Sequence, residues 1–444
     1  MGRIGLWATR TPGTYVGYLA AQLAGVTVVP LNPRFPARRN DVIAQHSGLR
    51  TVLRDGRPVA LDAEGAAAAS DPAVAYVLFT SGSTGTPKGV PIKHSNVIPY
   101  VAHNVERYGV GPGDRLTQTF DLTFDPSVFD LFVAWGAGAT LVVPEPEEVR
   151  SPVDFVNSRG ITHWFSVPSV VSLAGRLRSL SAGAMPGLRW SLFAGEQLTV
   201  EQAGAWREAA PFSHIENLYG PTELTITCTA YRVPADRADW PRTPNGTVPI
   251  GRRYPHLEHV VLGPDGLPAE AGELCVRGPQ RFDGYLDTDH NRDRFVSFTP
   301  ANPDQPARTC DVTTTLTPAH WYRTGDRVRD LGDGELVHMG RLDSQVQVHG
   351  YRVELGEVEA ALRTHPNVQD AVVTVEDADL TAVYTGTATQ SVELSDWLNN
   401  ALPAYMIPRR YTHLTRLPLN DNGKVDRRAL ASPTGRAARG TALP

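Results

Sequence analysis

The sequence predicts an α/β fold of layered sheets and helices, followed by a smaller α+β domain. Over the first 230 residues, short apolar runs alternate with helix-like stretches, an order typical of stacked α/β layers. Between residues 250 and 340, paired short runs flank Gly-rich turns and predict hairpins. Past Asp343, a run of period two gives way to helical spacing, which predicts a separate small domain.

The first part of the chain supplies the strands of the layered sheets. Residues 15–31 are apolar but interrupted by Gln22, two glycines and Pro30, so they predict a helix, a turn and a strand. Further strands are predicted by the apolar runs 75–79, 140–143, 161–165 and 188–193. The last run ends at residues 194–196, where we expect a helix to begin.

The second part predicts hairpins and the final domain. Residues 260–262 and 273–276 flank the turn 263–266, and the turn 331–334 separates two more strands. Residues 299–320 predict a surface loop, residues 345–348 a strand and residues 354–362 a helix. We therefore expect three parts, namely an N-terminal core over 1–342, a C-terminal domain over 343–430, and a tail or linker over 431–444.

Composition and charge exclude several classes of protein. The formal net charge of −5 supplies no field for holding a nucleic-acid backbone. The three cysteines are far apart, which argues against a disulfide framework or a zinc site. The sequence has no apolar run of 18 residues and no signal-peptide pattern at its N-terminus. These features predict a soluble cytoplasmic protein that binds neither nucleic acid nor membrane.

A loop rich in Ser, Thr and Gly follows the predicted strand 75–79. It reads TSGSTGTPKG over residues 80–89, so hydroxyl groups, backbone N–H groups and the ammonium of Lys88 could converge on an anion. It is not a Walker A loop, because Pro87 precedes the lysine and no Ser or Thr follows it. A flexible turn is the alternative for this loop taken alone.

Four later motifs could also carry chemistry. NLYGPTE (217–223) combines an aromatic ring with a hydroxyl and a carboxylate, which suits adenine, phosphate and Mg²⁺. YRTGD (322–326) places an aspartate at a strand end, where it could bind a ribose diol. GRLD (340–343) lies where the texture changes, and NGKVDR (422–427) puts a lysine on a Gly turn. Each is weak alone, and a plain turn is the alternative.

The order of the motifs resembles the adenylate-forming superfamily, and within it the amino-acid adenylation domains of nonribosomal peptide synthetases. The resemblance spans roughly residues 4 to 430 and rests on FTSGSTGTPKG, FDPSVFDLF, NLYGPTE, GELCVRGPQRFDGYLD, YRTGD, GRLDSQVQVHGYRVELGEVE, LPAYMIP and NGKVDR. It implies a large N-terminal domain with a distorted β-barrel beside its layered sheets, joined by a hinge to the small C-terminal domain.

The resemblance also implies a reaction in two halves. A carboxylate attacks the α-phosphate of ATP to give an acyl-adenylate and pyrophosphate, and the acyl group then passes to a phosphopantetheine thiol. ATP and Mg²⁺ are the implied cofactors, and the phosphopantetheine is expected on a separate carrier protein, because no carrier motif follows Arg428. A small helper protein for folding is a further possible partner.

Residue roles follow from the same resemblance. Lys424 would neutralise charge at the reacting oxygens, Thr222 would touch phosphate, and Glu223 would ligate Mg²⁺. Asp326 and Arg341 would hold the ribose, Tyr219 would stack on adenine, and Asp343 would be the hinge. The remaining implied nucleotide-binding residues are Thr80, Ser81, Gly82, Ser83, Thr84, Lys88, Gly195, Glu196 and Asn217.

FDPSVFDLF is implied to set the substrate. Asp125 would pair with the ammonium of an amino acid, and a buried carboxylate without that partner would be costly. The implied pocket wall consists of Pro126, Phe129, Val170, Leu192, Ala194, Leu218, Ile226 and Thr227. Apart from Asp125 and Lys424, only Thr227 offers a hydrogen-bonding side chain, so we expect a neutral amino acid of small or medium size, with an α-, β- or imino acid left open.

Two alternatives and two departures remain. The chain could be an acyl- or aryl-CoA ligase of the same superfamily, or a non-catalytic remnant. Gln347 and His349 stand where the family usually carries Lys and Arg. The resemblance also begins late, and loss of an outer segment would expose apolar faces near residues 1–30.

Overall fold

The computed structural model describes residues 2–61, 69, 71–82, 86–311, 313–332, 334–376, 379–418, 425, 427 and 430. The chain divides into two units. Unit 1 comprises Met1–Leu31, Ser47–Leu78 and Gly89–Leu342, and unit 2 comprises Asn32–His46, Phe79–Lys88 and Asp343–Pro444. The division at Leu342 is where the sequence changes texture, whereas the grouping of two early segments with the C-terminal part was not predicted.

A first sheet contains the N-terminal strands in the order β4-β3-β1-β2-β5-β6. Its strands are β1 (Arg3–Trp7), β2 (Thr27–Leu31), β3 (Thr51–Arg54), β4 (Arg57–Ala60), β5 (Val74–Thr80) and β6 (Lys88–Lys93). Helix α1 (Pro12–Leu23) joins the parallel strands β1 and β2, which confirms the predicted helix, turn and strand. Three side chains of α1 are exposed: Val16, Leu19 and Leu23.

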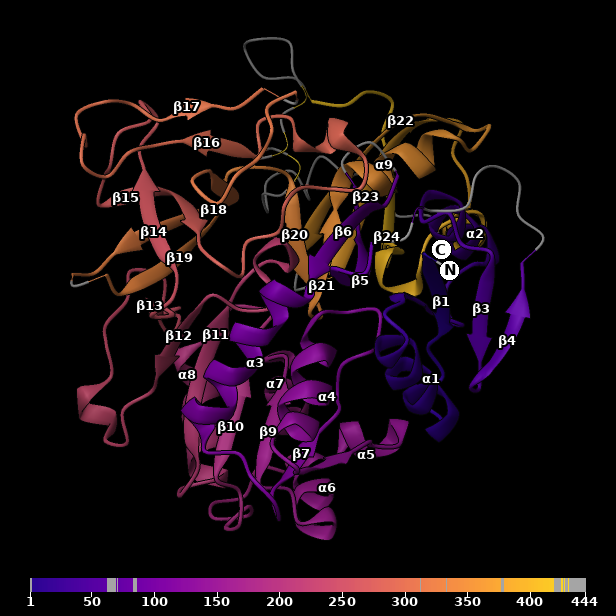
Figure 1. Ribbon diagram of the computed structural model, residues 1–444. Helices are drawn as coiled ribbons and strands as arrows, with labels where there is room; N and C mark the ends of the chain where they lie inside the picture. Colours follow the sequence, from indigo (N-terminus) through magenta and orange to yellow (C-terminus); the bar gives the residue numbers. More distant parts are fainter. Residues whose placement is uncertain are drawn as a thin grey trace. The chain divides into compact units, whose positions relative to one another are not determined.

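A second, seven-stranded sheet has the order β13-β12-β11-β10-β9-β7-β8 and is parallel from β11 to β8 (Figure 1). Its strands are β7 (Arg115–Thr117), β8 (Thr140–Val142), β9 (His163–Ser166), β10 (Trp190–Phe193), β11 (His214–Tyr219), β12 (Thr229–Arg232) and β13 (Arg252–Arg253). The predicted strands at 75–79, 140–143, 161–165 and 188–193 are thus confirmed to within one or two residues.

Helices cover both faces of this sheet because alternate strand residues point to opposite sides. In β10, Leu192 packs in the core that holds Phe129, whereas Phe193 packs in the core that holds Trp206. Helices α3 (His94–Tyr108) and α4 (Pro126–Gly136) lie side by side and contribute to the first core (Figure 1). The second core receives residues of α6 (Pro152–Arg159), α7 (Ser169–Arg176) and α8 (Val200–Ala209), and α5 (Pro146–Arg150) contacts α6 and α7.

The prediction that a helix begins at residues 194–196 is wrong. Gly195 has φ +84°, outside the helical region, and the Glu196 carboxylate accepts the backbone N–H of Ser169, 2.8 Å away, at the start of α7. Helix α8 begins at Val200 instead, where Thr199 forms a capping box with Gln202. The capping signal was therefore present in the sequence, four residues farther on.

A third, antiparallel sheet of unit 1 confirms the predicted hairpins. It contains β14 (Glu258–Leu262), β15 (Ala271–Arg277), β16 (Phe295–Ser297), β17 (Arg308–Thr309), β18 (Trp321–Asp330) and β19 (Leu336–Arg341). The loop predicted at 299–320 contains the two-residue strand β17, which pairs with β16. Short 3₁₀ helices lie at η1 (Thr222–Leu224), η2 (Arg237–Asp239) and η3 (Thr288–Asn291).

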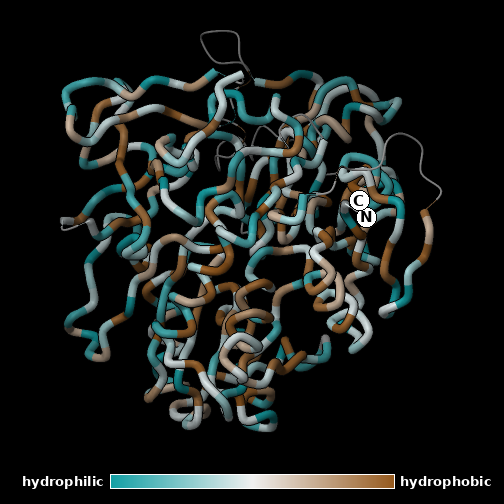
Figure 2. Tube along the Cα trace, in the orientation of Figure 1, coloured by the Kyte–Doolittle hydropathy of each residue, from teal (hydrophilic) through white to brown (hydrophobic). Residues whose placement is uncertain are grey.

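The C-terminal part of unit 2 has the predicted α+β character. The hairpin of β20 (Gln345–Val348) and β21 (Tyr351–Glu354) precedes α9 (Leu355–Arg363), and β22 (Val368–Glu376), β23 (Asp379–Gly386) and β24 (Arg410–His413) form a sheet. Helix α10 (Ser391–Asn399) and η4 (Ala404–Met406) follow β23, while α2 (Ala37–His46) is the early helix of this unit. In Figure 2, short brown stretches along the strands and helices alternate with teal turns, as the patterning predicted.

Candidate active site

Several predicted site residues follow directly from neighbouring strands of the second sheet. Strands β10 and β11 run parallel and end at Phe193 and Tyr219, so Ala194 and Gly220 begin loops at the same edge. Ligands of open α/β sheets bind outside the carboxyl ends of the strands. The topology alone therefore favours this edge as a binding site.

Four side chains converge on Asp326, and we call Tyr219, Asp326, His338 and Arg341 the Asp326 cluster. The Tyr219 hydroxyl donates to Asp326 Oδ2 over 2.6 Å, and an Arg341 guanidinium N–H donates to Oδ1 over 2.8 Å. His338 Nε2 lies 3.0 Å from the same Oδ1. The structure thus brings together the three residues that the sequence analysis linked to adenine and ribose, and it adds His338.

A neighbouring amide orients His338 within this cluster. The Gln197 amide donates to His338 Nδ1 over 2.9 Å, so Nε2 carries the proton that is donated to Asp326. Burial raises the pKa of Asp326, but the hydrogen bond from His338, the charge of Arg341 and the bond from Tyr219 outweigh it. The net pKa of Asp326 lies below its ordinary value, so the group is an anion at neutral pH.

Glu223 is fully buried in η1, between the predicted nucleotide and amino-acid residues. Its Oε1 accepts the Tyr285 hydroxyl over 2.6 Å, and its backbone carbonyl accepts the N–H of Phe282. A carboxylate oxygen is the donor that Mg²⁺ prefers, and Mg²⁺ commonly takes one carboxylate together with substrate phosphates and water. Glu223 fits such an ion on donor chemistry. The described residues contain no cluster of three metal-ligating side chains, so phosphates and water would complete the shell.

Most of the implied amino-acid pocket belongs to one core. Phe129, Leu192, Ala194, Leu218 and Ile226 all pack there, and the Phe129 ring stands edge-on to Tyr100, Tyr108 and Phe165. Val170 differs, because it packs against the core on the other face of the sheet. The structure therefore groups five of the predicted wall residues and sets Val170 apart.

Asp125 stands at the N-terminus of α4, next to Pro126, and is half-buried. Helix N-termini favour a negative charge there. Burial raises the pKa of the Tyr76 and Tyr100 phenols, and the charge of Asp125 raises both further, which places the two rings near the carboxylate. Asp125 thus provides an anionic group at the edge of an aromatic wall.

The hydroxyl of Thr227 is already bonded within the protein. It lies 3.1 Å from the Tyr100 hydroxyl and 2.7 Å from the Tyr254 hydroxyl, and Thr227 is 2% exposed. We call Tyr100, Thr227, Tyr254 and Gln280 the Thr227 cluster, since the Gln280 amide also binds the Thr227 carbonyl. The sequence analysis expected a hydrogen-bonding side chain for the substrate here, but Thr227 contributes mainly its methyl group.

The predicted phosphate loop belongs to unit 2 and is described there. The Ser81 hydroxyl donates to the Arg352 carbonyl and accepts the Glu354 N–H, and the Gly82 N–H donates to Glu357 over 3.3 Å. Lys88 is buried, with Nζ 3.7 Å from Glu354 Oε1. Thr80, at the end of β5, is half-buried. The predicted residues Ser83, Thr84 and Lys424 lie outside the described residues.

Other predicted residues are committed to backbone contacts or lie at the surface. The Asn217 amide donates to the carbonyls of Val248 and Pro249, and Glu196 binds Ser169 as described above. Thr222 is half-buried at the start of η1. Asp343 is exposed and accepts the Gln345 N–H over 3.2 Å.

Sequence reasoning missed His338, Tyr285 and Gln280. His338 and Arg341 are three residues apart on β19, which would normally place them on opposite faces. A register shift between Asp326 and Val328 on the paired strand lets both reach one carboxylate. No local pattern announces that shift.

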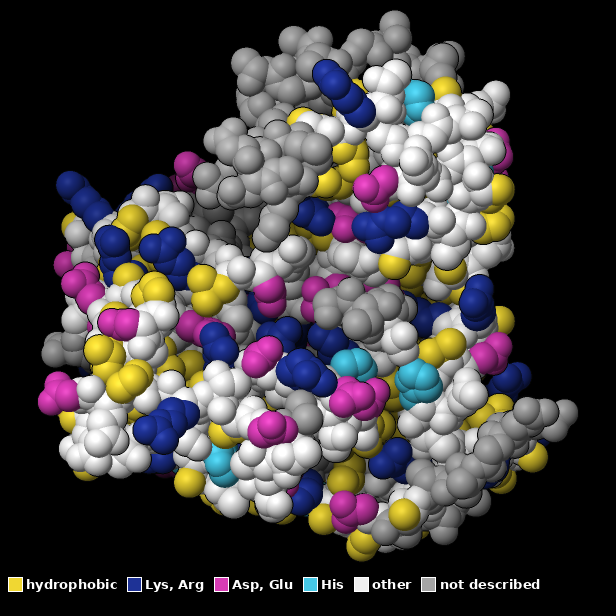
Figure 3. Space-filling model, turned by 90° about the horizontal axis from the view of Figure 1, so that it is seen from above, with side chains coloured by type: hydrophobic (Ala, Val, Ile, Leu, Met, Phe, Trp, Pro, Cys, Tyr) yellow, Lys and Arg dark blue, Asp and Glu magenta, His cyan; other side chains and the backbone are white. Residues whose placement is uncertain are grey.

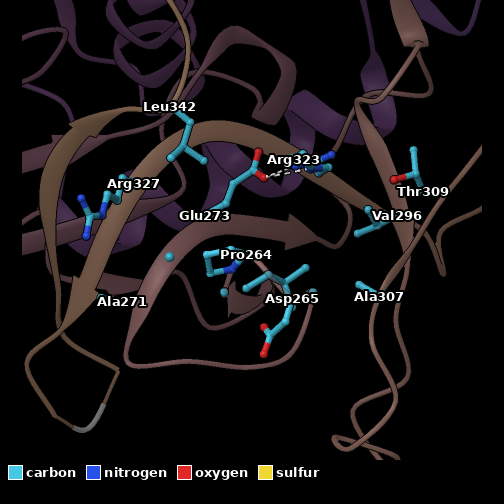
Figure 4. A pocket seen from close by; sticks show the side chains of 14 residues that line it. Pro264, Asp265, Ala271, Glu273, Val296, Ala307, Thr309, Arg323, Arg327 and Leu342 are labelled. Carbon is cyan, nitrogen blue, oxygen red and sulfur yellow. Dashed lines mark hydrogen bonds and ion pairs between the residues drawn. The ribbon is translucent and has the colours of Figure 1, made fainter. Parts of the chain in front are cut away.

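A separate cavity of about 610 Å³ lies in the antiparallel sheet of unit 1 (Figure 4). Its lining includes Pro264, Asp265, Glu273, Arg323 and Arg327. Glu273 is already bonded to Arg323, 2.6 Å away, and to the N–H of Gly325. None of the predicted site residues lines this cavity.

The molecular surface was inspected for charge and for membrane spans. Figure 3 shows basic and acidic side chains interspersed over the face in view, without an extended patch of one sign on that face. Within the described part of the chain, the helices are too short or too polar to cross a bilayer.

Comparison with known proteins gives consistent matches. A model of AMP-binding enzymes matches residues 2–286, and a model of the AMP-binding enzyme C-terminal domain matches residues 357–424. The chain is 34% identical over 472 residues to L-proline–[L-prolyl-carrier protein] ligase of Pseudomonas fluorescens, which covers 97% of this chain and 88% of that protein.

Two further matches define the extent of the similarity. The chain is 33% identical over 471 residues to tyrocidine synthase 3 of Brevibacillus parabrevis, covering 97% of this chain but 7% of that protein. The chain therefore spans only a small part of that relative. The crystal structure of the Vibrio cholerae adenylation domain AlmE, in complex with glycyl-adenosine-5′-phosphate, matches with a TM-score of 0.78 and 26% identity, covering 99% of this chain and 89% of that one.

Proposed function

This chain belongs to the family of AMP-binding enzymes, and from that premise we propose that it activates an amino acid with ATP and passes it to a carrier protein. The first step joins the substrate carboxylate to the α-phosphate of ATP and releases pyrophosphate. The second step moves the aminoacyl group to the thiol of a phosphopantetheine on a separate carrier. The named relatives that act on prolyl-carrier protein and bind glycyl-adenylate support both steps.

The observation that carries the choice of an amino acid is the position of Asp125. Its carboxylate lies at the edge of a wall formed by Phe129, Leu218 and other apolar side chains. An anion there needs a cationic partner, and the ammonium of an amino acid supplies one. The methyl face of Thr227 adds no polar group to the wall, which supports a neutral amino acid of small or medium size.

The Asp326 cluster provides the nucleotide half of the proposed site. Asp326 is anionic and oriented by Arg341 and His338, so it can accept hydrogen bonds from the two ribose hydroxyls. Tyr219, whose hydroxyl is fixed by Asp326, would offer its ring face to adenine. Thr222 would contact phosphate from the start of η1.

The loop 80–89 would hold the leaving pyrophosphate through Lys88 and backbone N–H groups. Lys424 would place its ammonium between the attacking carboxylate and the phosphate, because two anions otherwise repel each other. Mg²⁺, held by Glu223, would neutralise phosphate charge when bound. The protein's own residues orient the reactants, which is the main requirement of phosphoryl-transfer chemistry.

The transfer half would involve a movement at Asp343, where the two units divide. We propose that the carrier acts in trans in the cytoplasm, and that a small helper protein is a candidate partner for folding. The altered residues Gln347 and His349 lie on and after β20, where they would change the contacts made to the carrier.

The test is exchange of labelled pyrophosphate into ATP, measured against a panel of amino acids and of simple acyl and aryl acids. Exchange that depends on a neutral amino acid is expected. Exchange with simple acids alone would support a CoA ligase instead. Absence of exchange with every acid would point to a non-catalytic protein.

Two substitutions assign the roles. Asp125→Ala should raise the KM for the amino acid far more than the KM for ATP, and equal losses would indicate a structural role. Lys424→Ala should abolish adenylate formation, and unchanged exchange would contradict its assignment. Lys93→Ala, another of the three lysines, is the matched control.

A further inference from the structure

The loop that carries Ile226 and Thr227 has an unusual backbone. Thr225 and Ile226 have φ values of +57° and +76°, so two consecutive β-branched residues lie in the left-handed region. Such residues avoid this conformation because Cβ meets the backbone, and they adopt it only where the surroundings enforce it. The loop is therefore held by contacts from outside its own sequence.

Gln280 supplies those contacts. Its side-chain Nε2 donates to the carbonyls of Leu224, Thr225 and Thr227 at 3.0, 3.3 and 2.8 Å. Its backbone carbonyl accepts the Thr225 hydroxyl over 2.6 Å. Gln280 is 0% exposed, so water cannot replace these bonds.

Gln280 is itself fixed by its neighbours. Its Oε1 lies 2.5 Å from His256 Nε2, which leaves the amide nitrogen facing the loop carbonyls. The carbonyl of the preceding Pro279 accepts the Asn96 amide over 2.7 Å. The clamp thus rests on α3 and on the segment before β14, not on the loop that it holds.

The opposite side of the loop has no room to adjust. A Cβ on Gly220 would come within 2.5 Å of the Thr227 Cα, so the Gly220 backbone packs directly against Thr227. The Thr227 hydroxyl is bonded to Tyr100 and Tyr254. With these contacts in place, the Gln280 amide decides where the Ile226 and Thr227 side chains stand.

We propose that Gln280 is a positioning residue that sets the shape of the amino-acid pocket through Ile226 and Thr227. The proposal rests on the proposed function, because it assumes that these two side chains face an amino-acid substrate. Gln280 acts through the loop carbonyls and does not touch the substrate. It therefore governs the fit of the amino acid and leaves the Asp326 cluster, and with it ATP binding, unaffected.

The test compares Gln280→Met with the wild-type chain in the pyrophosphate exchange assay. Methionine keeps the length and apolar volume of the side chain but removes the three donated bonds. A displacement of the loop by about 1 Å should raise the KM for the preferred amino acid roughly ten- to hundredfold. The KM for ATP should stay unchanged, and discrimination between near-isosteric amino acids should fall.

Gln280→Glu is the second variant, since it keeps the acceptor for His256 and replaces only the donor by a carboxylate oxygen that repels the loop carbonyls. Trp206→Phe is the control for a general loss of stability, because it removes a buried bond to Ser191 on the other face of the second sheet. The control should lower the melting temperature without changing the KM for the amino acid.

The outcomes are distinguishable. If the wild-type chain exchanges pyrophosphate with an amino acid and either folded Gln280 variant keeps the same amino-acid KM and selectivity, the positioning role is wrong while the proposed function stands. An equal rise in both KM values would also overturn it. If the wild-type chain shows no amino-acid-dependent exchange, the proposed function fails, and this inference fails with it.

Discussion

The Asp326 cluster and the Thr227 cluster lie in the same unit and are both buried, yet they are built from opposite materials. Asp326 is an anion surrounded by a guanidinium, an imidazole and a phenol. Thr227 is a neutral hydroxyl between two phenols, with a neutral amide on its carbonyl. One cluster is held by charge and the other by hydrogen bonds that fix shape.

The difference indicates what each region can recognise. A buried anion with aligned donors keeps its charge and can accept the hydroxyl groups of a polar ligand. A set of neutral hydroxyls that satisfy one another leaves an apolar surface, which selects a ligand by volume. Changes in charge should therefore affect the first region, whereas changes in shape should affect the second.

The largest effect is expected for Asp326→Ala. The change leaves the charged donors Arg341 and His338 without their acceptor, and loss of a hydrogen bond to a charged group costs about 1.5–3 kcal/mol. The KM for ATP should rise roughly ten- to hundredfold, with little change in the KM for the amino acid. Pyrophosphate exchange with each substrate titrated in turn measures both values, and equal losses would contradict the separation of the two regions.

The second prediction concerns pH. The folded-state pKa of Asp326 is below its ordinary value, so its stabilising contribution is fully present above the unfolded pKa of about 3.9 and is lost as the pH falls through the folded value. Relative to Asp326→Asn, the wild-type free energy of unfolding should be larger at neutral pH, and this advantage should shrink below about pH 4. Urea titrations over a pH series measure it.

A matched comparison sharpens the pH prediction. Burial raises the pKa of Tyr100 and Tyr254 above the ordinary phenol value, so the Thr227 cluster is neutral at acid and neutral pH. The difference in stability between wild type and Thr227→Val should therefore be flat where the Asp326→Asn difference declines. A parallel decline in both would show that the two clusters are not independent.

Thr227→Val itself should have a smaller effect. It keeps the volume but leaves the two tyrosine hydroxyls without a buried partner, which should lower the free energy of unfolding by about 1–3 kcal/mol. Because the methyl group remains, the preference among amino acids should persist. Denaturant titration and a substrate panel give the two readouts, and a changed preference would show that the hydroxyl faces the substrate.

The smallest effect is expected for Lys93→Ala. Lys93 Nζ lies 2.6 Å from Asp283 Oδ2, but both side chains are exposed by a third or more. Exposed ion pairs contribute about 0–1 kcal/mol. Stability and both KM values should stay close to wild type, and a large kinetic loss would mean that this lysine takes part in the site.

Much of the fold follows from local patterns. Period-two runs and Gly-rich turns predicted the hairpins of β14, β15, β18 and β19, and the interrupted run 15–31 predicted α1 and β2. The helix expected at residues 194–196 failed because the Gly195 backbone and the Glu196 carboxylate serve the neighbouring helix α7 instead. The family resemblance was confirmed by both family models.

The candidate site was predicted unevenly. The resemblance linked Tyr219, Asp326 and Arg341, and the structure shows them in direct contact. It gave no indication of His338, which reaches Asp326 through a register shift between paired strands. It also assigned the Thr227 hydroxyl to the substrate, whereas two tyrosines from distant segments take it. The roles of Lys424 and Asp343 stay predictions.

The sequence by itself determined the family, the alternation of strands and helices, and the set of chemical groups available to the site, since each depends on neighbours within a few residues. Only the tertiary structure decided which of those groups meet. Gln280 lies more than 50 positions along the chain from each carbonyl that it binds. Contacts of that range depend on how the sheets and loops pack, and packing leaves no periodic trace in the order of the residues.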